Sequence, residues 1–188
     1  MSELVEMFDR STARFGDHVR AVADHQWAAP TPCEEWDVRA LVNHVVGEQL
    51  WAPHLIEGST MEEVGDRYDG DLLGDDPVAA WDAAVGPSVA AFAQPGALDR
   101  TVHLSYGDEA CSEYLLQMLT DAAVHGWDLA RAIGTDATID DDIASHLLGV
   151  WTEREALLRG SGVFAEPVPV ADDADATDRL VALLGRRP

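Results

Sequence analysis

Apolar residues recur at helical spacing in several long segments of this chain, and this periodicity constrains its fold more than any other feature of the sequence. The pattern predicts helices over residues 2–26, 37–52, 78–93, 112–133 and 139–158, and a short last helix over 177–184. Pro53 can kink or end the second helix, and Gly134 is suited to end the fourth. Helices with one apolar face bury it by packing against one another. We therefore expect an all-α fold built as a helical bundle.

The segments between these helices predict little regular structure. Residues 57–77 are rich in glycine and aspartate and are typical of a loop, and residues 164–175, with two prolines, are typical of an extended tail. Residues 101–104 are a candidate for a minor strand, with a turn at 106–108. The sequence shows no internal repeat and no linker composition. We expect a single domain over residues 1–188, with the tail starting at about residue 160.

Charge and composition exclude several classes of function. The formal net charge is -23, from 35 acidic residues against 12 basic ones, and lysine is absent. Such a surface repels phosphate backbones and anionic lipids, so we expect neither nucleic acid nor a membrane as partner. No apolar run approaches the roughly 20 residues that span a bilayer, and residues 1–16 lack the pattern of a signal peptide. We expect a cytoplasmic protein whose Cys33 and Cys111 are reduced and structural.

The predicted fourth helix combines a carboxylate and an imidazole near its apolar face. A projection at 100° per residue puts Asp121 and His125 on or beside that face, whereas Trp127 points the other way. The spacing of four residues lets both side chains reach one point. A carboxylate on a stripe that faces the core costs free energy unless it is paired or binds a metal. The second helix repeats the pattern, with His44 and Glu48 at the edge of its apolar face.

If the two helices lie side by side these four groups converge, which makes His44, Asp121 and His125 candidate metal ligands. Two imidazoles and one carboxylate, with coordination positions left open, suit Zn and also Fe(II), Ni or Mn. The same residues have simpler interpretations. His44 can be an exposed or satisfied histidine, and Asp121 with His125 can be a hydrogen-bonded pair within one helix, without any metal.

The other histidines and the tryptophans near the motifs are weaker candidates. His103 precedes the fourth helix, where it can line the mouth of a pocket. Trp36 and Trp51 can wall a pocket, although tryptophan at helical spacing more often belongs to the core. The remaining histidines occupy positions typical of solvated side chains: His18, His25, His54 and His146.

Three separated motifs resemble one known family. Residues 31–44 (TPCEEWDVRALVNH) are similar to the TPCxxWxVRxLVxH signature of the mycothiol-dependent maleylpyruvate isomerase N-terminal family, within the DinB-like superfamily. Residues 120–131 (TDAAVHGWDLAR) resemble its DxxxHxWDLAR segment, and residues 164–185 resemble the ending of an actinobacterial metal-binding subfamily. The resemblance implies a DinB-like four-helix bundle with additional short C-terminal helices. It also implies a divalent metal, often zinc, held by His44, Asp121 and His125, with Asp121 standing where the isomerase has the longer glutamate.

Known enzymes of the superfamily use low-molecular-weight thiols, such as mycothiol in actinobacteria. The resemblance therefore implies a metal-dependent thiol transferase or isomerase, with mycothiol as cosubstrate, an electrophilic substrate and, by analogy, a homodimer. Glu48 and Asp128 are candidate catalytic groups that orient a ligand or move a proton. Asp128 is alternatively a salt-bridge partner of Arg131, which we favour somewhat. Two other functions use the same ligands: a non-catalytic metal- or thiol-binding module, and a metal-dependent hydrolase that activates water.

Overall fold

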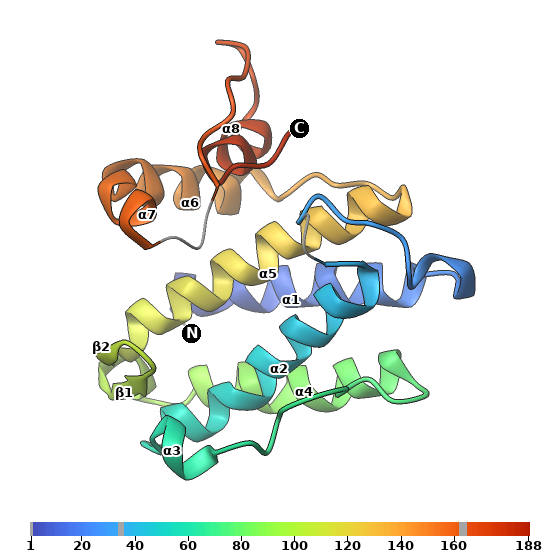
Figure 1. Ribbon diagram of the computed structural model, residues 1–188. Helices are drawn as coiled ribbons and strands as arrows, with labels where there is room; N and C mark the ends of the chain where they lie inside the picture. The colour runs from blue at the N-terminus through green and yellow to red at the C-terminus, as the bar shows by residue number, and fades with distance from the viewer. Residues whose placement is uncertain (1, 34–35, 162–164) are drawn as a thin grey trace.

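Four long helices form the body of the protein. The computed structural model describes residues 2–33, 36–161 and 165–188. The long helices are α1 (Glu3–Ala21), α2 (Val38–Ile56), α4 (Pro77–Phe92) and α5 (Cys111–Ile133). α1 packs against α4 and α5, and α2 packs against the same two helices, so the four close into a ring whose inward side chains form the core (Figure 1). The predicted all-α four-helix bundle is confirmed.

Shorter elements decorate this bundle. A hairpin of two antiparallel strands precedes α5 and pairs Thr101 with Ala110, which confirms the predicted minor strand. The described residues after α5 form three helices, and Figure 1 shows them stacked on the side of α5 away from α2 and α4. The short elements are α3 (Met61–Val64), β1 (Thr101–Leu104), β2 (Gly107–Ala110), α6 (Asp141–Glu153), α7 (Glu155–Ser161), α8 (Ala176–Leu183) and two 3-10 turns (Asp24–Gln26 and Ala97–Asp99).

Several predicted boundaries are wrong for identifiable reasons. The predicted loop over 57–77 contains α3, which begins at a capping box: the Thr60 hydroxyl accepts from the Glu63 N–H, and the Glu63 carboxylate accepts from the Thr60 N–H. Pro53 does not end α2, because it lies in the last turn, where the missing N–H costs a single hydrogen bond. The predicted helix over 139–158 is two helices, since the backbone at Arg154 leaves the helical region (φ -106, ψ 20).

Other predictions fall partly outside the described residues. The motif over 31–44 includes residues 34 and 35, and the predicted tail begins at residue 164; none of these is described. The first predicted helix ends earlier, at Ala21, and a 3-10 turn follows it.

Among the described helices, none combines the length and the apolar character that crossing a membrane requires.

The prediction that Trp127 points away from the apolar side of its helix is wrong. Trp127 is only 3% exposed and belongs to the same core cluster as Ile143 and Leu147 of α6. A further link between the two helices is the hydrogen bond from Trp151 Nε1 to the Thr120 hydroxyl, at 3.0 Å. A projection assumes that a helix buries one face. α5 buries two, because the bundle covers one side and the C-terminal helices cover the other.

Two of the four histidines predicted to be solvated are exposed, and two are not. His25 and His146 are exposed, as predicted. His18 is buried beside the Thr135 hydroxyl, 3.2 Å from its Nδ1, and this burial lowers the pKa of His18. His54 is half-buried, with its Nε2 2.7 Å from the Tyr68 hydroxyl. Neither lies among the three side chains of the candidate metal site.

Candidate metal centre

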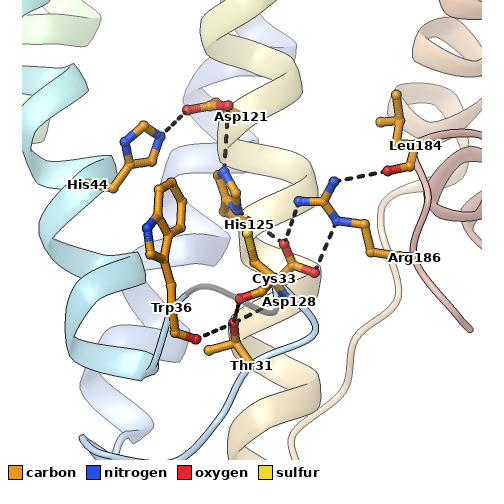
Figure 2. A network of polar contacts seen from close by, with 9 residues as sticks. All are labelled: Thr31, Cys33, Trp36, His44, Asp121, His125, Asp128, Leu184 and Arg186. Carbon is orange, nitrogen blue, oxygen red and sulfur yellow. Dashed lines mark hydrogen bonds and ion pairs between the residues drawn. The ribbon is translucent and has the colours of Figure 1, made fainter. Parts of the chain in front are cut away.

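α2 and α5 bring the three predicted metal ligands together. His44 Nε2 lies 2.9 Å from Asp121 Oδ2, and His125 Nε2 lies 3.7 Å from Asp121 Oδ1. One ligand atom from each residue can be chosen so that all three lie within 4.8 Å of one another. Figure 2 shows both imidazole rings turned toward the carboxylate from their separate helices. Residues 77 positions apart in the sequence thus form one cluster.

The spacing of these donor atoms suits one divalent ion. Donors bound to zinc at about 2.0–2.2 Å lie at most about 4.4 Å from one another. The distances of 2.9 and 3.7 Å between the imidazole nitrogens and the Asp121 carboxylate fall within that limit. Two imidazoles with one carboxylate are also a donor set that Zn, Fe, Ni and Mn accept. The residues present therefore fit the group that the family resemblance implies.

His125 is held in the orientation that a metal ligand needs. Its Nδ1 donates to Asp128 Oδ2 at 3.1 Å, and Asp128 is 0% exposed. A carboxylate only accepts hydrogen bonds, so in the neutral imidazole this contact places the ring proton on Nδ1 and the lone pair on Nε2. That lone pair faces Asp121 and His44. Metal-bound histidines commonly have such a carboxylate behind them, because it fixes both the tautomer and the ring angle.

The local charges pull His44 and Asp121 into an ion pair. Burial alone would lower the pKa of His44, but its hydrogen bond to Asp121 and the charges of Asp121 and Glu48 raise it above its ordinary value. Burial would likewise raise the pKa of Asp121, yet the charge of His125 and the hydrogen bond from His44 lower it. The pair is consistent with the simpler interpretation that requires no metal. A metal ion must displace the proton that His44 holds on Nε2.

Glu48 lies one helical turn beyond His44 and is half-buried. Burial and the charge of Asp121 raise the pKa of Glu48, although His44 and His125 oppose them. Nearby, the Tyr114 hydroxyl is buried and has no hydrogen-bond partner among the residues that the structure describes. A buried hydroxyl without a partner costs free energy, so a bound ligand or water at this hydroxyl would be favourable.

One tryptophan and one cysteine lie close to the histidines of the cluster. The Trp36 ring lies 4.5 Å from that of His44 and 5.4 Å from that of His125, so Trp36 packs against both histidines of the cluster. Trp51 packs instead on Tyr68, at 6.1 Å. Cys33, predicted to be only structural, places its sulfur in a group with His125 and Asp128 whose ligand atoms lie within 4.8 Å of one another. Its place in the motif just before α2 was the signal for this.

The other cysteine and histidine candidates lie in structural settings. Cys111 is fully buried, and burial raises the pKa of its thiol to about 11, which fits the predicted structural role. His103 Nδ1 lies 2.7 Å from Asp108 Oδ1 across the β1–β2 hairpin. Neither side chain belongs to the candidate metal cluster among the described residues.

The predicted salt bridge between Asp128 and Arg131 is wrong. Arg131 instead lies over the Trp127 ring, 5.4 Å from its centre. Asp128 pairs with Arg186, which the sequence reasoning missed entirely; Arg186 Nη2 lies 3.0 Å from Asp128 Oδ2. A charge buried on α5 needs a counter-charge, and that requirement was the available signal. It could not name Arg186, because the partner lies 58 positions away.

Comparisons with known proteins identify the family and the fold of this chain. Residues 8–130 match the family model described as the mycothiol maleylpyruvate isomerase N-terminal domain. An uncharacterised protein of Mycobacterium tuberculosis, found in two strains, is 33% identical over 186 residues, which cover 94% of each chain. Crystal structures of the mycothiol-dependent maleylpyruvate isomerase and of a histidine-to-alanine mutant share the fold, with TM-scores of 0.61 and 0.62. Their sequences are 18% and 17% identical to this one, and each likeness covers 81% of this chain and 71% of theirs. The chain belongs to the mycothiol maleylpyruvate isomerase N-terminal domain family.

Proposed function

We propose that this protein is a metal-dependent enzyme that joins a low-molecular-weight thiol of the mycothiol type to an electrophilic substrate, as a transferase or an isomerase. The orientation of His125 carries the proposal: buried Asp128 holds its Nδ1, so Nε2 is directed at Asp121 and His44. The thiol is proposed from the family, whose model and structural relatives are described as mycothiol-dependent or mycothiol-linked.

His44, Asp121 and His125 are the proposed ligands of a divalent ion, with zinc as the first choice. Three protein ligands leave coordination positions for a substrate, as in reactive rather than structural sites. A divalent cation bound there stabilises a thiolate near neutral pH, which makes the thiol a nucleophile. The proposed ligands stand on two bundle helices rather than on loops, so their separation is fixed by the packing of α2 on α5.

The surrounding residues divide into one that can exchange protons and one that cannot reach a substrate. Glu48 lies beside the ligands, and its raised pKa lets it hold a proton closer to neutral pH than an ordinary glutamate, so we propose that it moves a proton to or from the substrate. Asp128 lies behind His125 and is 0% exposed, so we propose a positioning role for it. Trp36 shields the His44 and His125 rings on one side.

We further propose that residues 1–188 act as one domain in the cytoplasm, where thiols stay reduced. A homodimer is the assembly that the family resemblance favours, and light scattering coupled to size exclusion measures it directly.

Metal analysis of protein purified without a metal-affinity tag tests the ligand assignment. We expect about one divalent ion per chain in the wild type and none in the double variant His44→Ala, His125→Ala. His146→Ala is the matched control, because it removes an exposed histidine of α6 and leaves the cluster intact. A double variant that keeps one ion per chain would show that these histidines are not the ligands.

Calorimetric titration with mycothiol then tests the activity class. We expect heat of binding from metal-loaded protein and none from protein stripped of metal. Binding without turnover of any electrophile would indicate a thiol-binding module. Hydrolysis without a thiol would indicate the hydrolase. Either result would contradict the proposed thiol-dependent enzyme.

A further inference from the structure

The last residues of the chain fold back onto α5. After α8, Gly185 adopts a left-handed backbone (φ +86), and the Arg186 N–H donates to the Val181 carbonyl at 2.9 Å. This turn aims the Arg186 side chain at the bundle, and Arg186 Nη1 donates to the Leu184 carbonyl at 3.0 Å. A Cβ at Gly185 would lie 2.6 Å from the Ala165 Cβ, so the turn has no room for a side chain.

Arg186 contacts both oxygens of the Asp128 carboxylate. Its Nη2 lies 3.0 Å from Asp128 Oδ2, and its Nε lies 3.4 Å from Oδ1 (Figure 2). Both side chains are shielded, at 11% exposed for Arg186 and 0% for Asp128. A guanidinium is charged at all ordinary pH values and matches the two oxygens of a carboxylate in one plane. Asp128 is thereby held as a charged acceptor in a fixed position.

The Asp128 oxygen that binds Arg186 also binds the proposed metal ligand His125. Asp128 Oδ2 accepts both from Arg186 and from His125 Nδ1, at 3.0 and 3.1 Å. If Arg186 were missing, the buried carboxylate would lack a permanent counter-charge and would lose the fork that fixes its angle. His125 would then lose the partner that keeps its Nε2 directed at the other ligands. These contacts connect the C-terminal tail, meaning residues 184–186, to the proposed metal site.

We propose that Arg186 is a positioning residue for the metal ligand His125, acting through Asp128, and that docking of the C-terminal tail and binding of metal are therefore coupled. The inference rests on the proposed function, because it assumes a metal at His44, Asp121 and His125. Coupling of this kind is reciprocal: if the docked tail strengthens metal binding, then metal binding strengthens docking of the tail.

Zinc affinity measured by competition with a chromogenic chelator tests the positioning role. We expect Arg186→Ala to weaken zinc binding about 10-fold, the lower end of the range of about 10- to 100-fold found when the partner of a metal-bound histidine is itself removed, because Asp128 stays in place. Arg186→Lys should fall between that variant and the wild type, because it keeps the charge but loses the fork. Arg187→Ala is the matched control. Arg187 follows Arg186 in the sequence but is exposed, so its removal should leave the zinc affinity within about twofold of the wild type.

A folded Arg186→Ala with the affinity of the wild type would overturn the inference while leaving the metal site in place. A wild type that binds no zinc would instead overturn the proposed function. Should Arg186→Ala fail to fold, hydrogen exchange of the wild-type protein decides the matter. We expect zinc to slow exchange of the amides of residues 184–186 more than that of the hairpin amides of residues 101–110. Equal effects on both segments would contradict the coupling.

Discussion

Two aspartates of α5, Asp121 and Asp128, each hold one end of His125, yet their environments differ completely. The Asp121 side chain is 33% exposed and lies beside two histidines, with His44 Nε2 at 2.9 Å and His125 Nε2 at 3.7 Å. Asp128 is 0% exposed and is bound by Arg186 as well as by His125. The histidines around Asp121 can exchange a proton for a metal ion, whereas the arginine at Asp128 cannot. This difference is the basis for proposing Asp121 as a metal ligand and Asp128 as a positioning residue.

The largest effect expected from this comparison is on stability. Asp128→Ala leaves Arg186 buried without its partner, so we expect the free energy of unfolding to fall by about 3–5 kcal/mol. Asp121→Ala removes a partly exposed ion pair and should cost the metal-free protein less than about 1 kcal/mol. Urea unfolding of both variants without metal measures the two losses. Equal losses would show that the two carboxylates do not differ in the way proposed.

A smaller effect is expected at the turn that aims Arg186. Gly185→Ala places a side chain at a left-handed position, which costs about 1–2 kcal/mol, and adds a clash with Ala165. Gly134→Ala is the matched control, because Gly134 ends α5 at φ +76 with no atom within 4 Å of the added Cβ. Urea unfolding should show a larger loss for Gly185→Ala.

Zinc affinity should separate the same two glycine variants. We expect Gly185→Ala to bind zinc more weakly than the wild type, because the Arg186 side chain is no longer aimed at Asp128. Gly134→Ala should bind zinc as the wild type does. If Gly134→Ala bound zinc more weakly than Gly185→Ala, the turn at Gly185 would have no part in positioning His125 through Asp128.

The smallest effect is a dependence of stability on pH at the Asp121 side. The pKa of His44 is raised, so its pairing stabilises the metal-free protein below about pH 6.5 and is lost as the pH rises through the pKa of the folded state. The pKa of Asp121 is lowered, so its pairing is present above about pH 3.8 and is lost as the pH falls through its folded-state pKa. The contribution is therefore largest between these two values.

Asp121→Asn provides the measurement. The difference in free energy of unfolding between the metal-free wild type and this variant should peak between about pH 4 and pH 6.5 and shrink above that range. A difference that stays constant from pH 4 to pH 8 would mean that His44 and Asp121 do not form the ion pair.

The sequence predicted those parts of the molecule that depend on neighbours along the chain. The four bundle helices follow from the period of their apolar residues. The convergence of Asp121 with His125 follows from their spacing of four residues. The periodicity placed His44 and Glu48 at the edge of the apolar face of the second helix, and the family motif favoured His44 as the third member. Local patterns missed α3, because its capping box spans only a few residues within a segment rich in glycine and aspartate.

Local patterns failed where a residue meets partners from a second layer. The projection predicts that Trp127 points away from the apolar face, because a projection of one helix cannot include α6 on the far side of α5. Proximity in the sequence favours Arg131 as the partner of Asp128, whereas in the structure Arg131 lies over the Trp127 ring. Helical spacing predicts nothing about Cys33, because it precedes α2, and only the packing of this segment brings its sulfur near His125 and Asp128.

The sequence by itself determined which side chains stand on which face of a helix, because the twist and rise of the helix fix that spacing whatever surrounds it. The tertiary structure alone decided what each carboxylate does. Asp121 and Asp128 are seven residues apart on one helix and project in nearly the same direction. Their burial and counter-charges come from α2 and from the C-terminal tail, elements far away in the sequence, and those surroundings leave one carboxylate available to a metal and commit the other to Arg186.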